Sequence, residues 1–152
     1  LECYVKPILM YGSECWTISS QMEQRLQAAE MWLYRKMLRI SWTDRVRNTE
    51  VLRRAETHRS LLKTIRLRQM QFLGHVVRKE GLEELLLTGC IEGKRSRGRR
   101  RQQYLQSLRQ WLEQHLPRTS HPVLSDIDIL RLAKDRTRWR SMIANARKEQ
   151  GT

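Results

Sequence analysis

The chain has 152 residues, enough for one modest domain or two small helical subdomains with a buried core. Thirty lysines and arginines and 16 acidic residues give a net charge of +14. Such a charge indicates which molecules the chain can bind and says nothing about its fold. RNA, DNA and an anionic membrane surface all fit that charge, but no stretch approaches the roughly 18 apolar residues of a membrane-spanning helix. We therefore expect a nucleic-acid partner and no membrane.

The cysteines and the first residue indicate the setting of the chain. Cys3, Cys15 and Cys90 are an odd number, and none forms a Cys-x-x-Cys pair. This favours a reducing compartment, nuclear or cytoplasmic, over a disulfide framework. No signal peptide is visible. Because the chain begins with Leu1 rather than methionine, we expect a fragment whose N-terminal neighbour is missing.

The first forty residues have nearly balanced charge and indicate scaffold. Residues 1 to 18 predict a short apolar helix, with Pro7 in its first turn or at a kink, and a strand is the competing interpretation. Ser20 followed by Glu23 has the spacing of a capping box and predicts the start of a long helix. Apolar residues then recur every three or four positions and predict one buried stripe: Met22, Leu26, Ala29, Leu33, Met37 and Ile40.

The opposite flank of this long helix is basic, with Trp32 in its middle. The indole could stack on a base while neighbouring cations hold phosphates. Alternatively, it could pack against another helix or the missing domain, and this is the interpretation we expect. The cations of the flank are Arg25, Arg35, Lys36 and Arg39.

The charge excess is largest in residues 41 to 79, with ten basic and three acidic groups. A polar turn from Ser41 to Asn48 precedes a short helix to about Glu56, capped by Asn48 or Thr49. Ser60 opens a second long helix to about Lys79. Its predicted apolar face consists of Leu61, Leu62, Ile65, Phe72, Leu73 and Val76. Its predicted polar face consists of Lys63, Arg68, Gln71, His75 and Arg78.

Gly74 and His75 are the two unusual residues of that helix. Glycine inside a helix costs about 1 kcal/mol relative to alanine, so a close neighbour is expected at Gly74, which we place on the polar side. Another helix is the commoner explanation, and a sugar-phosphate backbone is the alternative. His75 could donate to a phosphate or stack on a base, or it could simply be exposed or pack on a helix.

A basic strap interrupts the helical pattern. Residues 93 to 101 contain six cations and two glycines, so this segment can bury nothing and gains by lying against a polyanion. Helices are predicted from about Arg101 to Pro117, after a cap at Ser125 or Asp126, and after a cap at Asp135. The prediction is an all-α protein with a helical bundle over residues 1–92, a basic linker over 93–101 and a C-terminal helical segment over 102–152.

The sequence contains no constellation typical of catalysis. The four histidines are scattered, no cysteine pairs with them at zinc-ligand spacing, and no Walker-type phosphate loop is present. Asp126, Asp128 and Asp135 could chelate Mg²⁺ in a nuclease, but aspartates at helix starts are more often caps. We expect no catalytic residue, metal site or cofactor in this chain.

Five segments, in order along nearly the whole chain, carry a family resemblance. They are Val5–Trp16, Arg35–Asn48, Phe72–Arg78, Gly93–Arg101 and Ala133–Arg140. Together they resemble the region downstream of the polymerase palm in non-LTR retrotransposon (LINE-type) reverse transcriptases. The resemblance implies a thumb and C-terminal portion of a protein with an endonuclease and an RNA-directed DNA polymerase domain. The catalytic aspartates and their Mg²⁺ would lie in that palm, upstream of Leu1.

In this family the thumb grips the RNA/DNA template-primer, so we expect sequence-independent phosphate contacts. The expected contact residues are Arg45, Arg47 and Asn48 in the turn, Lys63, Arg68, Gln71, His75 and Arg78 on the helix, and Lys94, Arg95, Arg97, Arg99, Arg100 and Arg101 in the strap. A cysteine-histidine knuckle found in some relatives is missing. The alternative is a stand-alone helical interaction domain whose strap is a nuclear-localisation signal.

Overall fold

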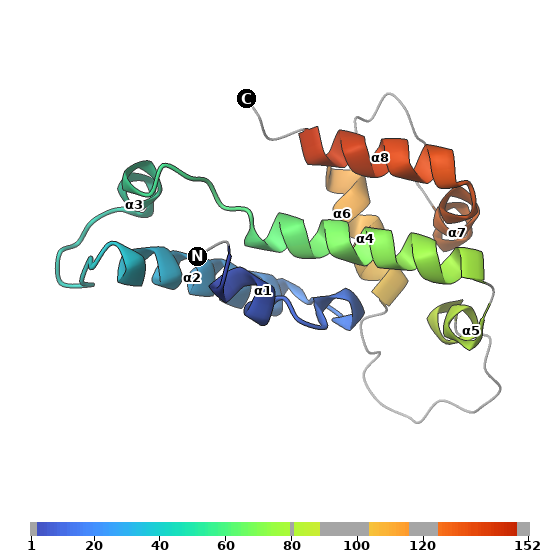
Figure 1. Ribbon diagram of the computed structural model, residues 1–152, viewed down its shortest axis with the longest axis horizontal. Helices are drawn as coiled ribbons and strands as arrows, with labels where there is room; N and C mark the ends of the chain where they lie inside the picture. Colours follow the sequence, from blue (N-terminus) through green and yellow to red (C-terminus); the bar gives the residue numbers. More distant parts are fainter. Residues whose placement is uncertain (1–2, 80, 89–103, 116–124, 149–152) are drawn as a thin grey trace. The chain divides into compact units, whose positions relative to one another are not determined.

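The computed structural model describes residues 3–79, 81–88, 104–115 and 125–148, and the regular structure in these ranges is helical (Figure 1). The predicted all-α fold is therefore confirmed. The chain divides into two compact units, one of residues 1–12 and 18–65 and the other of residues 13–17 and 66–152. Of the described helices, none combines the length and the apolar character needed to cross a membrane.

The two units contain different helices, except that α4 is divided between them. The first unit contains α1 (Val5–Leu9), α2 (Ser20–Met37), α3 (Asn48–Arg54) and the first turn of α4 (Leu61–Lys79). The second contains the 3-10 turn η1 (Ser13–Cys15), the rest of α4, α5 (Leu82–Thr88), α6 (Tyr104–His115), α7 (Asp126–Lys134) and α8 (Arg136–Lys148). Residues 66–88, which the sequence grouped with the N-terminal bundle, thus belong with the helices after residue 103. The predicted linker at 93–101 lies outside the described residues.

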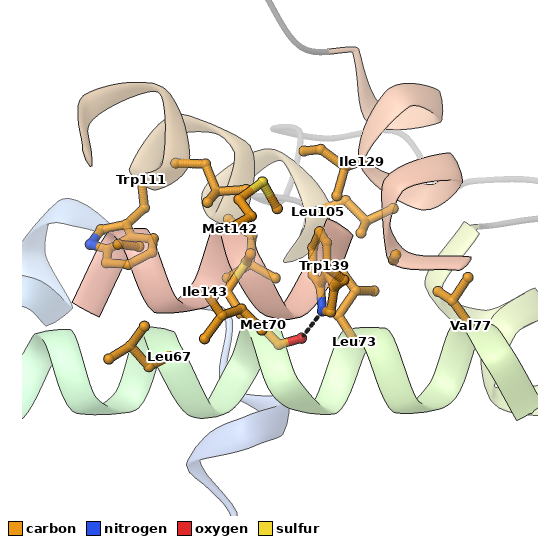
Figure 2. Packing of buried hydrophobic residues seen from close by; sticks show 14 residues of the cluster. Leu67, Met70, Leu73, Val77, Leu105, Trp111, Ile129, Trp139, Met142 and Ile143 are labelled. Carbon is orange, nitrogen blue, oxygen red and sulfur yellow. Dashed lines mark hydrogen bonds between the residues drawn. The ribbon is translucent and has the colours of Figure 1, made fainter. Parts of the chain in front are cut away.

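The core of the second unit forms where α4, α6, α7 and α8 meet (Figure 2). Its buried apolar side chains are Leu67, Met70, Leu73 and Val77 of α4, Leu105, Leu108, Trp111 and Leu112 of α6, Ile129 and Ala133 of α7, and Trp139, Met142, Ile143 and Ala146 of α8. Apolar periodicity in the sequence predicts the face of α8 at Trp139, Met142, Ile143 and Ala146, and all four are buried. It also predicts a face of α6, where Leu105, Leu108, Trp111 and Leu112 are buried and Tyr104 is half-buried, while the predicted Leu116 lies outside the described residues. In α7, Ile129 is buried and Ile127 is exposed.

Gly74 is buried where α8 lies against α4. The indole of Trp139 covers it and donates its N–H to the carbonyl oxygen of Met70 at 3.0 Å (Figure 2). A methyl group on residue 74 would collide with the indole nitrogen and lie 2.5 Å from its Cδ1 atom. Helix packing therefore explains this glycine, and its predicted place on the exposed polar side is wrong.

Polar side chains of α4 are buried in the same unit, which the sequence did not indicate. Gln69 donates from Nε2 to the carbonyl oxygens of Ser13 at 3.0 Å and Trp16 at 2.9 Å. Arg66 donates to the hydroxyl of Ser107 at 3.2 Å. These bonds satisfy groups that would otherwise be costly to bury, and they fix η1 and α6 against α4.

The buried face of α2 differs from the predicted stripe. Its buried residues are Leu26, Glu30, Met31, Tyr34 and Arg35. Met22 and Met37, two residues of the predicted stripe, are exposed. The predicted capping box at Ser20 is also wrong by one residue, because Ser19 is the cap and accepts the Met22 backbone N–H at 3.3 Å.

A buried carboxylate joins α2 to the start of α4. Glu30 is 1% exposed, and its Oε1 atom accepts the backbone N–H groups of Ser60 and Leu61, each at 2.9 Å. Lys6 of α1 is 3% exposed, lies 4.0 Å from the same oxygen and donates to the Ser60 hydroxyl at 2.7 Å. The carboxylate thus satisfies unpaired N–H groups at a helix start, and the ammonium compensates its charge.

Helix α1 occupies only Val5–Leu9 of the predicted range and buries a lysine rather than the apolar residues of that segment. A short helix is present, but the residue it buries is Lys6, while Tyr4 and Ile8 are exposed. The charge of Glu30 determines this orientation, because a buried carboxylate without a partner is far costlier than two exposed apolar side chains.

Replacing Gly74 with alanine will destabilise the second unit by about 1–3 kcal/mol, the usual range for overpacking. The added methyl group must displace the Trp139 indole and break its bond to Met70. Urea unfolding measures the loss, with His75→Ala, an exposed neighbour on the same helix, as the control. A Gly74→Ala protein more stable than wild type, as expected for an open helical glycine, would contradict the packing.

Replacing Glu30 with glutamine will lower the free energy of unfolding of the first unit by about 3–5 kcal/mol, because Lys6 is left buried without a counter-charge. Amide hydrogen exchange at Ser60 and Leu61 should accelerate together with this loss. The control is Glu56→Gln, an exposed carboxylate of the same unit. Unchanged exchange at both amides in the Glu30 variant would refute the role given to the carboxylate.

Candidate nucleic-acid interface

Helix α4 leaves one narrow arc open to solvent in the second unit. Its 19 residues include five lysines and arginines and no carboxylate. Packing buries most of its circumference, while Gln71 and His75 are exposed and Arg68 and Arg78 are half-buried. The structure therefore brings together four of the five residues predicted for the polar face. The fifth, Lys63, is half-buried and belongs to the first unit.

Protein groups already hold the two arginines of this arc. Arg68 lies with its Nε atom 3.3 Å from Glu14 Oε1, and Arg78 donates from Nη1 to the Ala133 carbonyl oxygen at 2.7 Å. A partly exposed ion pair such as that of Arg68 with Glu14 contributes about 1 kcal/mol or less. The bond of Arg78 leaves other guanidinium N–H groups for a ligand and fixes the side chain in place.

The turn before α3 carries the predicted cations in exposed positions. Arg45 and Arg47 are exposed, and Arg45 has a left-handed backbone with φ of 50°. The predicted cap at Asn48 is wrong, because Arg47 occupies the cap position without a side-chain bond. The amide oxygen of Asn48 instead accepts from Arg35 Nη2 at 3.0 Å.

Arg35 is a buried organising residue rather than part of an exposed flank. It is 5% exposed and also donates from Nη2 to the Val46 carbonyl oxygen at 2.6 Å. Its guanidinium carbon lies 4.7 Å from the centroid of the Trp42 ring. A desolvated arginine over an indole contributes a cation–π attraction, so Arg35 fixes the turn and one face of this indole against α2.

A pocket of about 420 Å³ opens beside this arginine. Its lining consists of Trp32, Arg35, Lys36, Arg39, Ile40, Ser41 and Trp42. Trp42 is 70% exposed and Trp32 is 47% exposed, so packing within the described chain covers only part of either indole. The ammonium of Lys36 lies 5.7 Å from the centroid of the Trp32 ring.

Arg39 lines this pocket from a strained backbone position. Its φ is 54°, its N–H donates to the Lys36 carbonyl oxygen at 3.2 Å, and the N–H of Ile40 donates to the Arg35 carbonyl oxygen at 2.9 Å. These bonds form a Schellman motif, in which glycine is the usual residue. A side chain in the left-handed region costs about 1–2 kcal/mol, and strain of this kind gathers at functional sites.

Trp42 is the pocket residue that sequence reasoning missed. One indication of its role is present in the sequence: Trp42 is an aromatic residue in a polar turn, directly after the basic end of a helix. The pairing with Arg35 depends on how the turn folds back, which periodicity does not encode. The strap residues Lys94, Arg95, Arg97, Arg99, Arg100 and Arg101 lie outside the described residues.

The three aspartates considered for a metal site have other partners. Asp128 forms a capping box with Ser125, and hydrogen bonds from Ser125 lower the pKa of this aspartate. Asp135 accepts the N–H groups of Thr137 and Arg138 at 3.0 and 3.1 Å, as the predicted cap should. The carboxylate of Asp126 accepts from Arg109 at 3.2 Å. Within the described ranges, no three His, Cys, Asp or Glu side chains gather as metal ligands.

Comparison of the chain with protein-family models, with curated proteins and with solved structures found no match. The functional assignment consequently depends on the exposed arc of α4, the exposed turn and the aromatic pocket.

Arg53 and Arg54 are both paired with Glu50 on an exposed side of α3. Hydrogen bonds from both guanidinium groups hold the pKa of Glu50 at about 2, below its ordinary 4.5. Because the folded-state pKa is lowered, the stabilisation is present above about pH 4.5 and disappears as the pH falls through about 2.

In the Arg53→Gln/Arg54→Gln double variant, we expect the pKa of Glu50 to return toward 4.5, measured by carboxyl carbon NMR titration. Asp128, whose pKa is lowered by Ser125, should titrate as in wild type and is the internal control. A Glu50 that still titrates near 2 without the two arginines would contradict this cause.

Proposed function

We propose that this chain binds nucleic acid by phosphate contacts, as the thumb and C-terminal segment of a LINE-type reverse transcriptase that grips the RNA/DNA template-primer. The observation that carries the proposal is the exposed arc of α4. This helix has five cations and no carboxylate, and it presents Arg68, Gln71, His75 and Arg78 on one side. The resemblance noted in the sequence supports the same function.

The arc suits contacts that position a duplex without reading its sequence. Arginine, glutamine and histidine side chains all donate to phosphate or sugar oxygens, and such contacts carry no base information. Because the arc lies on a helix buried on its other sides, the donors keep fixed spacings. Arg45 and Arg47 supply a second group of exposed donors in the first unit.

In this proposal the chain contributes binding and no chemical step. The aspartates that hold Mg²⁺ and the polymerase reaction belong to the palm domain, which is expected upstream of Leu1 and would be the protein partner of this chain. Affinity would come mainly from counterion release, so it should depend strongly on salt.

Binding of a blunt RNA/DNA hybrid, measured by fluorescence anisotropy, should weaken about a thousand-fold or more between 50 and 200 mM salt if six to ten phosphates are contacted. The Arg45→Gln/Arg68→Gln variant should reduce the slope of log affinity against log salt by roughly two, because each lost phosphate contact contributes about 0.9.

The matched control is Arg136→Gln/Arg140→Gln, which removes the same charge from exposed positions on α8. It should leave the slope nearly unchanged. Affinity that is insensitive to salt, or an equal effect of the two double variants, would refute the proposed contacts.

A further inference from the structure

The pocket formed by Trp32, Lys36, Arg39 and Trp42 combines features that phosphate contact alone does not need. It has two partly exposed indoles, and cationic side chains are the only charged groups in its lining. It is a hollow of about 420 Å³ that is open to solvent. A phosphate-only surface would require the cations but gain nothing from exposed aromatic rings.

The arrangement of Trp42 fits a stacking platform. Arg35 covers one face of the ring at 4.7 Å and is itself buried and hydrogen-bonded, so the indole has a fixed support. The residue is 70% exposed, so Arg35 leaves most of the indole accessible to a ligand. A flat ring held from one side and open on the other is what a nucleobase needs as a stacking partner.

We propose that this pocket binds an unpaired nucleotide of a single-stranded nucleic acid, with its base stacked on Trp42 beside Trp32 and its phosphate on Lys36 and Arg39. A base inside a duplex already has stacking neighbours on both faces, whereas an unpaired base has a face to offer. The inference builds on the proposed function, because the single strand would be the overhang that extends from the bound template-primer.

The left-handed backbone at Arg39 is shared by a second residue, which provides a control for it. Glu56 occupies the equivalent position after α3, with φ of 48° and N–H bonds of the same Schellman pattern, but it does not line the pocket. Both residues therefore bear the same local strain. The strain is therefore not specific to the pocket; the difference is that Arg39 lines the pocket with Trp32 and Trp42 and Glu56 does not.

The test compares the wild type with Trp42→Ala on three probes: a blunt RNA/DNA hybrid, the same hybrid with a single-stranded overhang, and that overhang made abasic. The wild type should bind the overhang hybrid about 5- to 100-fold more tightly than its abasic counterpart, as expected for one stacked base. Trp42→Ala should abolish this difference and leave blunt-hybrid affinity unchanged. Equal affinity of the wild type for the overhang and abasic probes would overturn the inference.

Variants at Arg39 separate loss of binding from loss of folding. Arg39→Gly relieves the left-handed strain and should keep or raise the melting temperature, yet weaken binding to the overhang hybrid about tenfold by removing a charged donor. Glu56→Gly relieves the same strain, and Arg25→Gln removes the same charge from an exposed position on α2. Both controls should retain overhang binding, and a loss in either equal to that of Arg39→Gly would overturn the role of Arg39.

The two proposals fail in different ways. If the blunt hybrid binds with the expected salt dependence but the overhang adds nothing, the pocket inference fails and the phosphate-binding function stands. If the hybrid is not bound, the proposed function fails. The pocket inference is then tested by comparing the affinities of a free single strand and of the same strand made abasic. Equal binding of those two strands would overturn the pocket inference as well.

Discussion

The fold depends on the hydrogen bonds between the buried carboxylate of Glu30 and the first backbone N–H groups of α4. This helix matters to the whole chain because each of the two units contains part of it. Glu30 accepts two of the N–H groups that any helix leaves unpaired at its start, and Lys6 balances its charge. Such an arrangement contributes little net stability compared with an apolar contact, but it strongly disfavours any other pairing, because each charge is costly without the other. We infer that it specifies which surface of α2 faces α4.

Charge dominates this sequence, but burial and pairing reduce the share that is available to a ligand. Arg35 and Arg66 are buried and bonded to protein oxygens. Arg53 and Arg54 are paired with Glu50. Total net charge therefore does not show where a polyanion would bind, because buried cations contribute to the charge without being accessible. Exposed, structurally supported side chains are a better guide.

The sequence predicted those parts of the fold in which burial follows hydrophobicity. The apolar faces of α6 and α8 were found because each of these helices buries one regular stripe against the core. The prediction failed for α1 and α2, whose buried faces include Lys6, Glu30 and Arg35. Single-residue polarity places such groups on the surface, and only their mutual contacts in three dimensions make burial favourable.

The aromatic pocket illustrates the same limit at a functional level. The sequence shows Trp32 among cations and favours its packing against another helix or a missing domain, because aromatic side chains contribute much of the buried area in cores and interfaces. The missing information was the position of Trp42, which depends on Arg35 reaching across the turn to Val46 and Asn48. A buried arginine thus fixes an exposed tryptophan beside a strained arginine. Arg35 is held by its own hydrogen bonds and Arg39 by the bonds that end α2, so hydrophobic periodicity alone could not have placed either side chain beside Trp42.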